Sequence, residues 1–119
     1  MSDATPNREW RFYVDDMIGF CEKVEIFTRG LDQARFTSDA MRFDATIRNI
    51  ELIGEAATRI PEAVRLAVPS IPWRMIIATR NQLIHGYLGI DNDTVWSLVN
   101  SDIPALWSAL KELKTTLPT

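Results

Sequence analysis

Apolar residues in the first quarter of the chain recur at intervals of three and four positions. Because an α-helix repeats every 3.6 residues, this spacing places them along one helical face. The set consists of Trp10, Tyr13, Val14, Met17, Phe20, Cys21, Val24 and Phe27. The pattern predicts a helix from Arg8 to Arg29, which Gly30 ends.

A second long helix is expected from Asp39 to Ile60, with Ser38 or Asp39 as its N-cap. It follows a short connection, residues 31–38, that carries Phe36. Pro61 ends this helix, and the segment up to Pro69 is typical of a short helical turn between two prolines.

Three further helices are expected in the second half of the chain. One runs from about Pro72 to Gly86, and a shorter one with Val95, Trp96 and Val99 is capped by an oxygen from residues 91–93. The last helix is expected to begin separately from the one before it, at Asp102 and Pro104. Its buried face consists of Leu106, Leu110 and Leu113.

No segment alternates between apolar and polar residues with a period of two, so the sequence gives no support for strands. Helices near 20 residues long suit an all-α, up-and-down antiparallel bundle with short loops. The length of 119 residues and an apolar content of 46% indicate one domain, residues 1–119. The polar ends, residues 1–7 and 115–119, are expected to be flexible.

Composition limits the classes of function. The net charge of −3 argues against broad binding along nucleic acid, although a few clustered arginines can still hold one or two phosphates. Cys21 is the only cysteine and lies among apolar residues, so we expect a buried, reduced thiol and a cytoplasmic protein. No apolar run is long enough for a signal peptide or a membrane span. One cysteine and one distant histidine form no ligand cluster, so we expect neither a metal site nor a cofactor.

An arginine occupies an unusual position in the segment IPWRMIIATRNQLIHGYLGID, residues 71–91. At 100° per residue, Arg80 falls near the middle of an apolar helical face. That face consists of Trp73, Ile76, Ile77, Leu83, Ile84 and Tyr87. Because a buried, unpaired guanidinium is strongly disfavoured, Arg80 must meet an acid or open onto a cleft where a phosphate is its partner. A purely structural pair with Glu51 or Glu55 stays open beside the functional interpretation.

His85 is the only histidine and follows Asn81 by four residues, so the two side chains share a flank of the helix. Gly86 places His85 in the final turn, where the negative end of the helix dipole favours a protonated imidazole and thus a proton donor. A capping or surface role is the plainer alternative for His85.

Two further sets of residues have plain structural interpretations. One set is a polar stripe on the helix expected from Asp39 to Ile60; it consists of Asp44, Arg48, Glu51, Glu55 and Arg59. The simplest interpretation is a solvent-exposed face with an ion pair between Asp44 and Arg48. Two alternatives stay open: the stripe makes dimer contacts, or it supplies the acid that holds Arg80. The tryptophans lie at core spacing, which favours packing over base stacking. They are Trp10, Trp73, Trp96 and Trp107.

Residues 80–87, Arg-Asn-Gln-Leu-Ile-His-Gly-Tyr, resemble the Arg-x4-His motif of HEPN ribonucleases in the extended form, ending in x-Tyr, that typifies HepT toxins. The resemblance covers roughly residues 8–115 and shows no departure at the motif positions. Flanking segments that share it are Arg48-Asn49-Ile50-Glu51, Ile53-Gly54-Glu55-Ala56, Pro72-Trp73, Ile90-Asp91, Val95-Trp96 and Ile103-Pro104 with Leu106.

The resemblance implies a HEPN fold, a homodimer with its active cleft between two motif helices, and a metal-independent endoribonuclease that is the toxin of a toxin–antitoxin system. It also implies a partner, a minimal nucleotidyltransferase antitoxin of the MntA type, which transfers AMP to the motif tyrosine, here Tyr87. A bulky anionic adduct beside Arg80 would block the cleft and compete for the guanidinium.

Metal-free RNA cleavage needs a deprotonated 2′-hydroxyl, a neutralised phosphorane and a protonated 5′-oxygen. A two-fold dimer supplies two histidines and two arginines for these tasks. We expect His85 to transfer protons and Asn81 to orient the phosphate or His85. Arg80 and Tyr87 are expected to contact the substrate, tRNA or mRNA, with Arg80 stabilising the transition state. The expected products carry a 2′,3′-cyclic phosphate and a 5′-hydroxyl.

Two other functions stay open. One is a non-catalytic helical module that binds a nucleotide, or docks a nucleotidyltransferase, through Arg80 and Tyr87. The other is a helical dimer in which the motif is structural. The combination of His85 with Asn81 favours the nuclease, because a phosphate-binding module needs no poised acid–base group.

Overall fold

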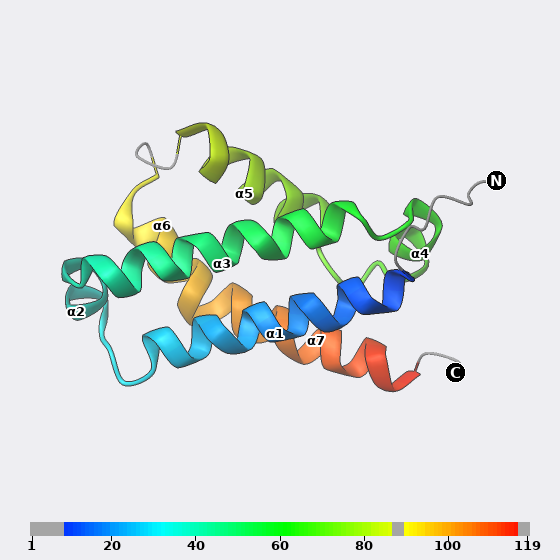
Figure 1. The fold of residues 1–119 in the computed structure, drawn as a ribbon, viewed down its shortest axis with the longest axis horizontal. Helices are drawn as coiled ribbons and strands as arrows, with labels where there is room; N and C mark the ends of the chain where they lie inside the picture. The colour runs from blue at the N-terminus through cyan, green and yellow to red at the C-terminus, as the bar shows by residue number, and fades with distance from the viewer. Residues whose placement is uncertain (1–8, 87–89, 117–119) are drawn as a thin grey trace.

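A computed structural model describes residues 9–86 and 90–116, and every regular element in these ranges is helical (Figure 1). The helices are α1 (Trp10–Thr28), α2 (Gln33–Ser38), α3 (Ala40–Thr58), α4 (Glu62–Ala67), α5 (Trp73–Gly86), α6 (Asn92–Ser97), the π-helical turn η2 (Leu98–Asp102) and α7 (Ile103–Thr116). The expected all-α class is therefore confirmed.

The four longer helices form a bundle in which successive helices run in opposite directions. In Figure 1, α3 lies between α1 and α5, and α7 lies against the other side of α1. Buried apolar residues from all four helices form one continuous core; those that are fully buried include Val14, Met17, Ala57 and Leu110. Because α5 packs on the outside of α3, much of the surface of α5 is exposed to solvent.

Helix α1 has the expected extent to within two residues, and Arg8 lies outside the described residues. Its end is set by Gly30, whose φ of 78° is in the left-handed region that glycine adopts without strain. The Leu31 amide then donates to the Thr28 carbonyl at 3.1 Å. The glycine stop read from the sequence is confirmed.

The segment expected to be a simple connection contains the short helix α2. It forms because the Asp32 carboxylate accepts a hydrogen bond from the Arg35 amide at 2.9 Å, which caps the helix. The helix carries Phe36 into the core, where its ring lies 5.2 Å from Phe43 and 5.7 Å from Trp96 between centroids.

Asp39 is the N-cap of α3, one of the two candidates from the sequence, and accepts from the Arg42 amide at 3.1 Å. Helix α4 then forms the expected turn after Pro61. At the start of α5, the Trp73 indole donates to the Val68 carbonyl at 3.1 Å, which ties this helix to the loop before it.

The expected restart at Asp102 and Pro104 is wrong, because α6, η2 and α7 follow one another without a break. The Ile103 amide donates to the Leu98 carbonyl, five residues back, so the chain makes a π-helical turn there. A proline inside an α-helix normally clashes with the carbonyl four residues before it. The wider turn directly before Pro104 relieves that clash, and the helix continues to Thr116.

Among the described residues, no helix combines the length and the apolar character that crossing a bilayer requires.

Candidate functional site

Helix α5 approaches α3 closely at Gly54. A Cβ at this position would overlap the Cβ of Arg80 and come within 2.9 Å of its Cγ and 3.1 Å of the Ile76 carbonyl oxygen. The absence of a side chain on Gly54 therefore allows the stem of Arg80 to lie against the backbone of α3. This contact fixes where the guanidinium emerges.

The guanidinium of Arg80 is held by two side chains. Nη2 donates to Oε1 of Glu55 at 2.7 Å, and Nη1 donates to Oδ1 of Asn81 at 2.8 Å. The side chain is 27% exposed, and its Nε is buried with no hydrogen-bond partner among the described residues. Arg80 is thus anchored at the edge of the core with its outer surface still open to solvent.

The acid that meets Arg80 is Glu55, which settles the choice left open by the sequence. Glu51, one turn earlier on α3, instead accepts from Arg48 at 3.2 Å. The i,i+4 pair expected between Asp44 and Arg48 does not form in the described part of the chain. The polar stripe is therefore largely a solvated face from which Glu55 reaches the arginine on α5.

Glu55 bridges two arginines. A hydrogen bond from Arg59, whose Nη2 lies 3.3 Å from Oε2, lowers the pKa of Glu55; partial burial opposes this, and the positive charge of Arg80 adds to the lowering. The carboxylate is consequently ionised at neutral pH. Two guanidinium groups therefore share one carboxylate, and Asp16 lines the same hollow as Glu55 and Arg59.

Asn81 and His85 are both exposed on the outer flank of α5. Asn81 uses its carbonyl oxygen to accept from Arg80, which leaves its amide nitrogen for another acceptor. His85 lies in the last turn of the helix, four residues on. The structure thus brings Arg80 and Asn81 into direct contact and places His85 one turn farther along the surface of α5.

The buried stripe of α5 is narrower than expected. Trp73, Ile76 and Leu83 are buried around Arg80, but Ile84 is 47% exposed. Ile84 therefore belongs to the predicted apolar face without being buried in the core. Tyr87, the expected modification and substrate-binding residue, lies outside the described residues.

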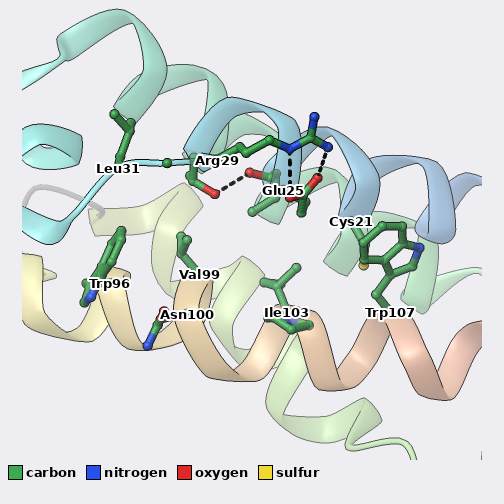
Figure 2. Close-up of a pocket in the computed structure, with 13 residues that line it drawn as sticks. Cys21, Glu25, Arg29, Leu31, Trp96, Val99, Asn100, Ile103 and Trp107 are labelled. Atoms are coloured by element: carbon green, nitrogen blue, oxygen red, sulfur yellow. Dashed lines mark hydrogen bonds and ion pairs between the residues drawn. The ribbon is translucent and has the colours of Figure 1, made fainter.

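A separate hollow lies between the C-terminal half of α1 and the η2–α7 segment (Figure 2). Its volume is about 290 Å³, and its lining includes Cys21, Trp96 and Trp107 but none of the motif residues.

Trp73 is buried, and the other three tryptophans pack against the core as expected. Cys21 is completely buried, and burial raises the pKa of its thiol to about 12.

Within residues 9–86 and 90–116, no three His, Cys, Asp or Glu side chains converge as metal ligands would.

Sequence reasoning missed Gly54 as a structural part of this site. Its signal was the presence of glycine within a 19-residue helix, where it is less favourable than alanine by about 1 kcal/mol. Such a glycine indicates a close approach by another element.

The described residues form an all-helical bundle, and Arg80 and His85 lie on one helix of it, α5. The chain belongs to the HepT-like ribonuclease family, whose model, described as "Ribonuclease HepT-like", matches residues 17–113.

Relatives support this assignment along nearly the whole chain. A protein of Thermococcus cleftensis named "Probable ribonuclease HepT" is 36% identical over 107 residues, which are 90% of this chain and 97% of that protein. A "Putative RNase" of Methanocaldococcus jannaschii is 33% identical over 101 residues, 85% of this chain and 87% of the relative.

A second Methanocaldococcus jannaschii protein, named "Gamma-glutamylcyclotransferase and putative RNase", is 32% identical over 99 residues. The match covers 83% of this chain but 45% of that protein, so the similarity is confined to part of it. No solved structure matches this chain.

Proposed function

We propose that this chain is the toxin of a toxin–antitoxin system, and that residues 1–119 act as one domain that cleaves tRNA or mRNA in the cytoplasm without a metal ion. The observation that carries the proposal is the arrangement on α5. Arg80 is anchored by Glu55 and Asn81, and an exposed His85 follows Asn81 by one turn. A cation and an imidazole five residues apart on one helix supply the charge stabilisation and the proton transfer that phosphodiester cleavage requires.

The active species in this proposal is a homodimer with two α5 helices facing each other across the RNA. Ile84 is 47% exposed on the flank that carries the motif, and a second α5 would cover it. One chain has one histidine, whereas cleavage needs a base and an acid. A two-fold axis near α5 supplies both from the two copies of His85.

The proposed reaction is an internal transfer at phosphorus. One His85 removes the proton of the 2′-hydroxyl, and the 2′-oxygen forms a bond to phosphorus. The bond to the 5′-oxygen breaks as the second His85, in its protonated form, donates a proton to that oxygen. Arg80 stabilises the charge that develops on the phosphorane, and Asn81 orients the phosphate. The products are a 2′,3′-cyclic phosphate and a 5′-hydroxyl.

Silencing is proposed to occur at Tyr87. A nucleotidyltransferase partner joins the phenol oxygen to the α-phosphate of ATP and releases pyrophosphate. The bound AMP is anionic and lies seven residues beyond Arg80 in sequence, so it competes with RNA for the guanidinium.

The test is to incubate the purified chain with total RNA in excess chelator, and to determine the chemistry of the new ends. We expect cleavage with cyclic-phosphate and 5′-hydroxyl ends, and its loss after treatment with the partner and ATP. The variant Tyr87→Phe should cleave RNA and resist silencing. Activity that requires magnesium, or products with 3′-hydroxyl ends, would contradict the proposed mechanism.

A further inference from the structure

A third polar residue lies on the same stripe of α5 as Asn81 and His85. At 100° per residue, Arg74 projects between Asn81 and His85, within about 20° of each. The three side chains are exposed, and so is the small Ala78 between them, which leaves the stripe unobstructed. Along the helix axis Arg74 lies about 10 Å from Asn81 and about 16 Å from His85.

Arg74 differs in its contacts from the other arginines around the motif. Arg48, Arg59 and Arg80 each pair with a glutamate of α3. In the described part of the chain, Arg74 takes part in no ion pair or side-chain hydrogen bond. Its charge is therefore available to an external anion.

Arg74 also borders a hollow of about 600 Å³ between α4 and α5, which Arg65 lines from the opposite side. Among the residues that the structure describes, Arg65 likewise makes no ion pair, and its Nε is buried without a hydrogen-bond partner. Glu62 is the one acid in this lining, so cations outnumber acids two to one. Leu66 and Ile77 add apolar surface to the hollow.

We propose that Arg74, together with Arg65, binds backbone phosphates of the RNA strand several nucleotides from the scissile linkage. This inference rests on the proposed function, because the strand must pass Asn81 and His85 to reach Arg74. At about 3.4 Å per stacked nucleotide, the distances along α5 correspond to roughly three to five nucleotides. A dinucleotide cannot span this length, whereas a dodecanucleotide can.

The first test measures binding without cleavage. A fluorescent dodecanucleotide with 2′-O-methyl groups cannot form the cyclic phosphate, so its affinity for the chain is measured by anisotropy at several salt concentrations. We expect Arg74→Gln to raise Kd about five- to tenfold and to reduce the slope of log K against log salt by about 0.7 per lost contact. Arg65→Gln should act in the same direction.

The matched control is Lys23→Gln. Lys23 is exposed on α1, which packs on α3 and α7, and the substitution removes the same charge. An equal loss of affinity in Lys23→Gln and Arg74→Gln would overturn the inference, because the effect would then belong to net charge. Unchanged affinity in Arg74→Gln would also overturn it.

The second test compares cleavage of a dinucleotide with cleavage of a ribo-dodecanucleotide. Arg74→Gln should raise KM for the longer RNA about five- to tenfold and leave kcat/KM for the dinucleotide unchanged. Equal losses on both substrates would place Arg74 at the scissile phosphate and contradict the proposed path. If the unsubstituted chain cleaves neither RNA, the nuclease proposal fails, and the binding test still decides the role of Arg74.

Discussion

Gly54 of α3 lies directly against Arg80 of α5, and no Cβ fits between the two helices at that point. The contact puts the arginine stem on the backbone of α3 and brings its guanidinium to Glu55, the next residue along α3. One glycine therefore sets both the packing of α5 and the position of the cation in the candidate site.

Gly54→Ala should destabilise the fold. The added methyl overlaps Arg80, and overpacking of this kind lowers the free energy of unfolding by about 1–3 kcal/mol. The better helix propensity of alanine offsets about 1 kcal/mol of that. Urea unfolding measures the net change. Gly19→Ala in α1 is the control, because nothing lies within 4 Å of a Cβ there, and it should be neutral or stabilising. Equal effects at the two glycines would contradict the close-approach account.

Glu55→Gln should reduce RNA cleavage about tenfold, because the neutral amide holds Arg80 less firmly and a small displacement of a catalytic cation is costly. The matched control is Glu51→Gln, one turn earlier on α3, which contacts Arg48 and leaves Arg80 in place. Steady-state kinetics on one RNA substrate compares the two. If both variants keep full activity, Glu55 does not position Arg80 for the reaction.

The contribution of Glu55 to stability should depend on pH. Its pKa is lowered in the folded chain, so the stabilisation is fully present above the unfolded value, about 4.3, and is lost as pH falls through the folded pKa. Urea unfolding of the unsubstituted chain and Glu55→Gln should therefore differ at pH 7 and converge as the pH falls through the lowered pKa of Glu55. The difference will be small, because both partners in the pair are partly exposed to solvent. A gap that widens toward low pH would reverse the predicted sign.

Cys21 should resist alkylation in the folded chain. Its pKa of about 12 leaves roughly one thiolate in ten thousand at pH 8, and complete burial denies access to reagent. Iodoacetamide labelling followed by mass spectrometry should show modification only after denaturation. Rapid labelling under native conditions would show that the core around Cys21 opens readily.

The sequence predicted the helical bundle well because its apolar residues recur with the period of an α-helix. The face of α1, the glycine stop after it and the aspartate caps depend on neighbouring residues in the chain, and each was confirmed. The continuous run from α6 to α7 was missed because the π-helical turn that accommodates Pro104 has no marker in the local sequence.

The sequence predicted candidate site residues, but it did not predict the contacts between them. The pattern on α5 required an acid for Arg80 and left Glu51 and Glu55 equal, because both lie on one stripe of α3. Which of the two glutamates pairs with Arg80 depends on the point along α3 at which α5 packs. That point is set by the contact between Gly54 and Arg80, which are 26 positions apart in sequence. The sequence places Arg74 in a helix but does not indicate that, among the described residues, it makes no ion pair or side-chain hydrogen bond.

We propose that Arg80 and His85 carry out RNA cleavage. The most direct test of this proposal is the rate of cleavage of a labelled RNA in excess chelator by Arg80→Ala, His85→Ala and the unsubstituted chain, with helical content checked by circular dichroism. We expect each variant to lose a hundredfold or more of the cleavage rate with its fold intact. Full cleavage by either folded variant would contradict the proposal.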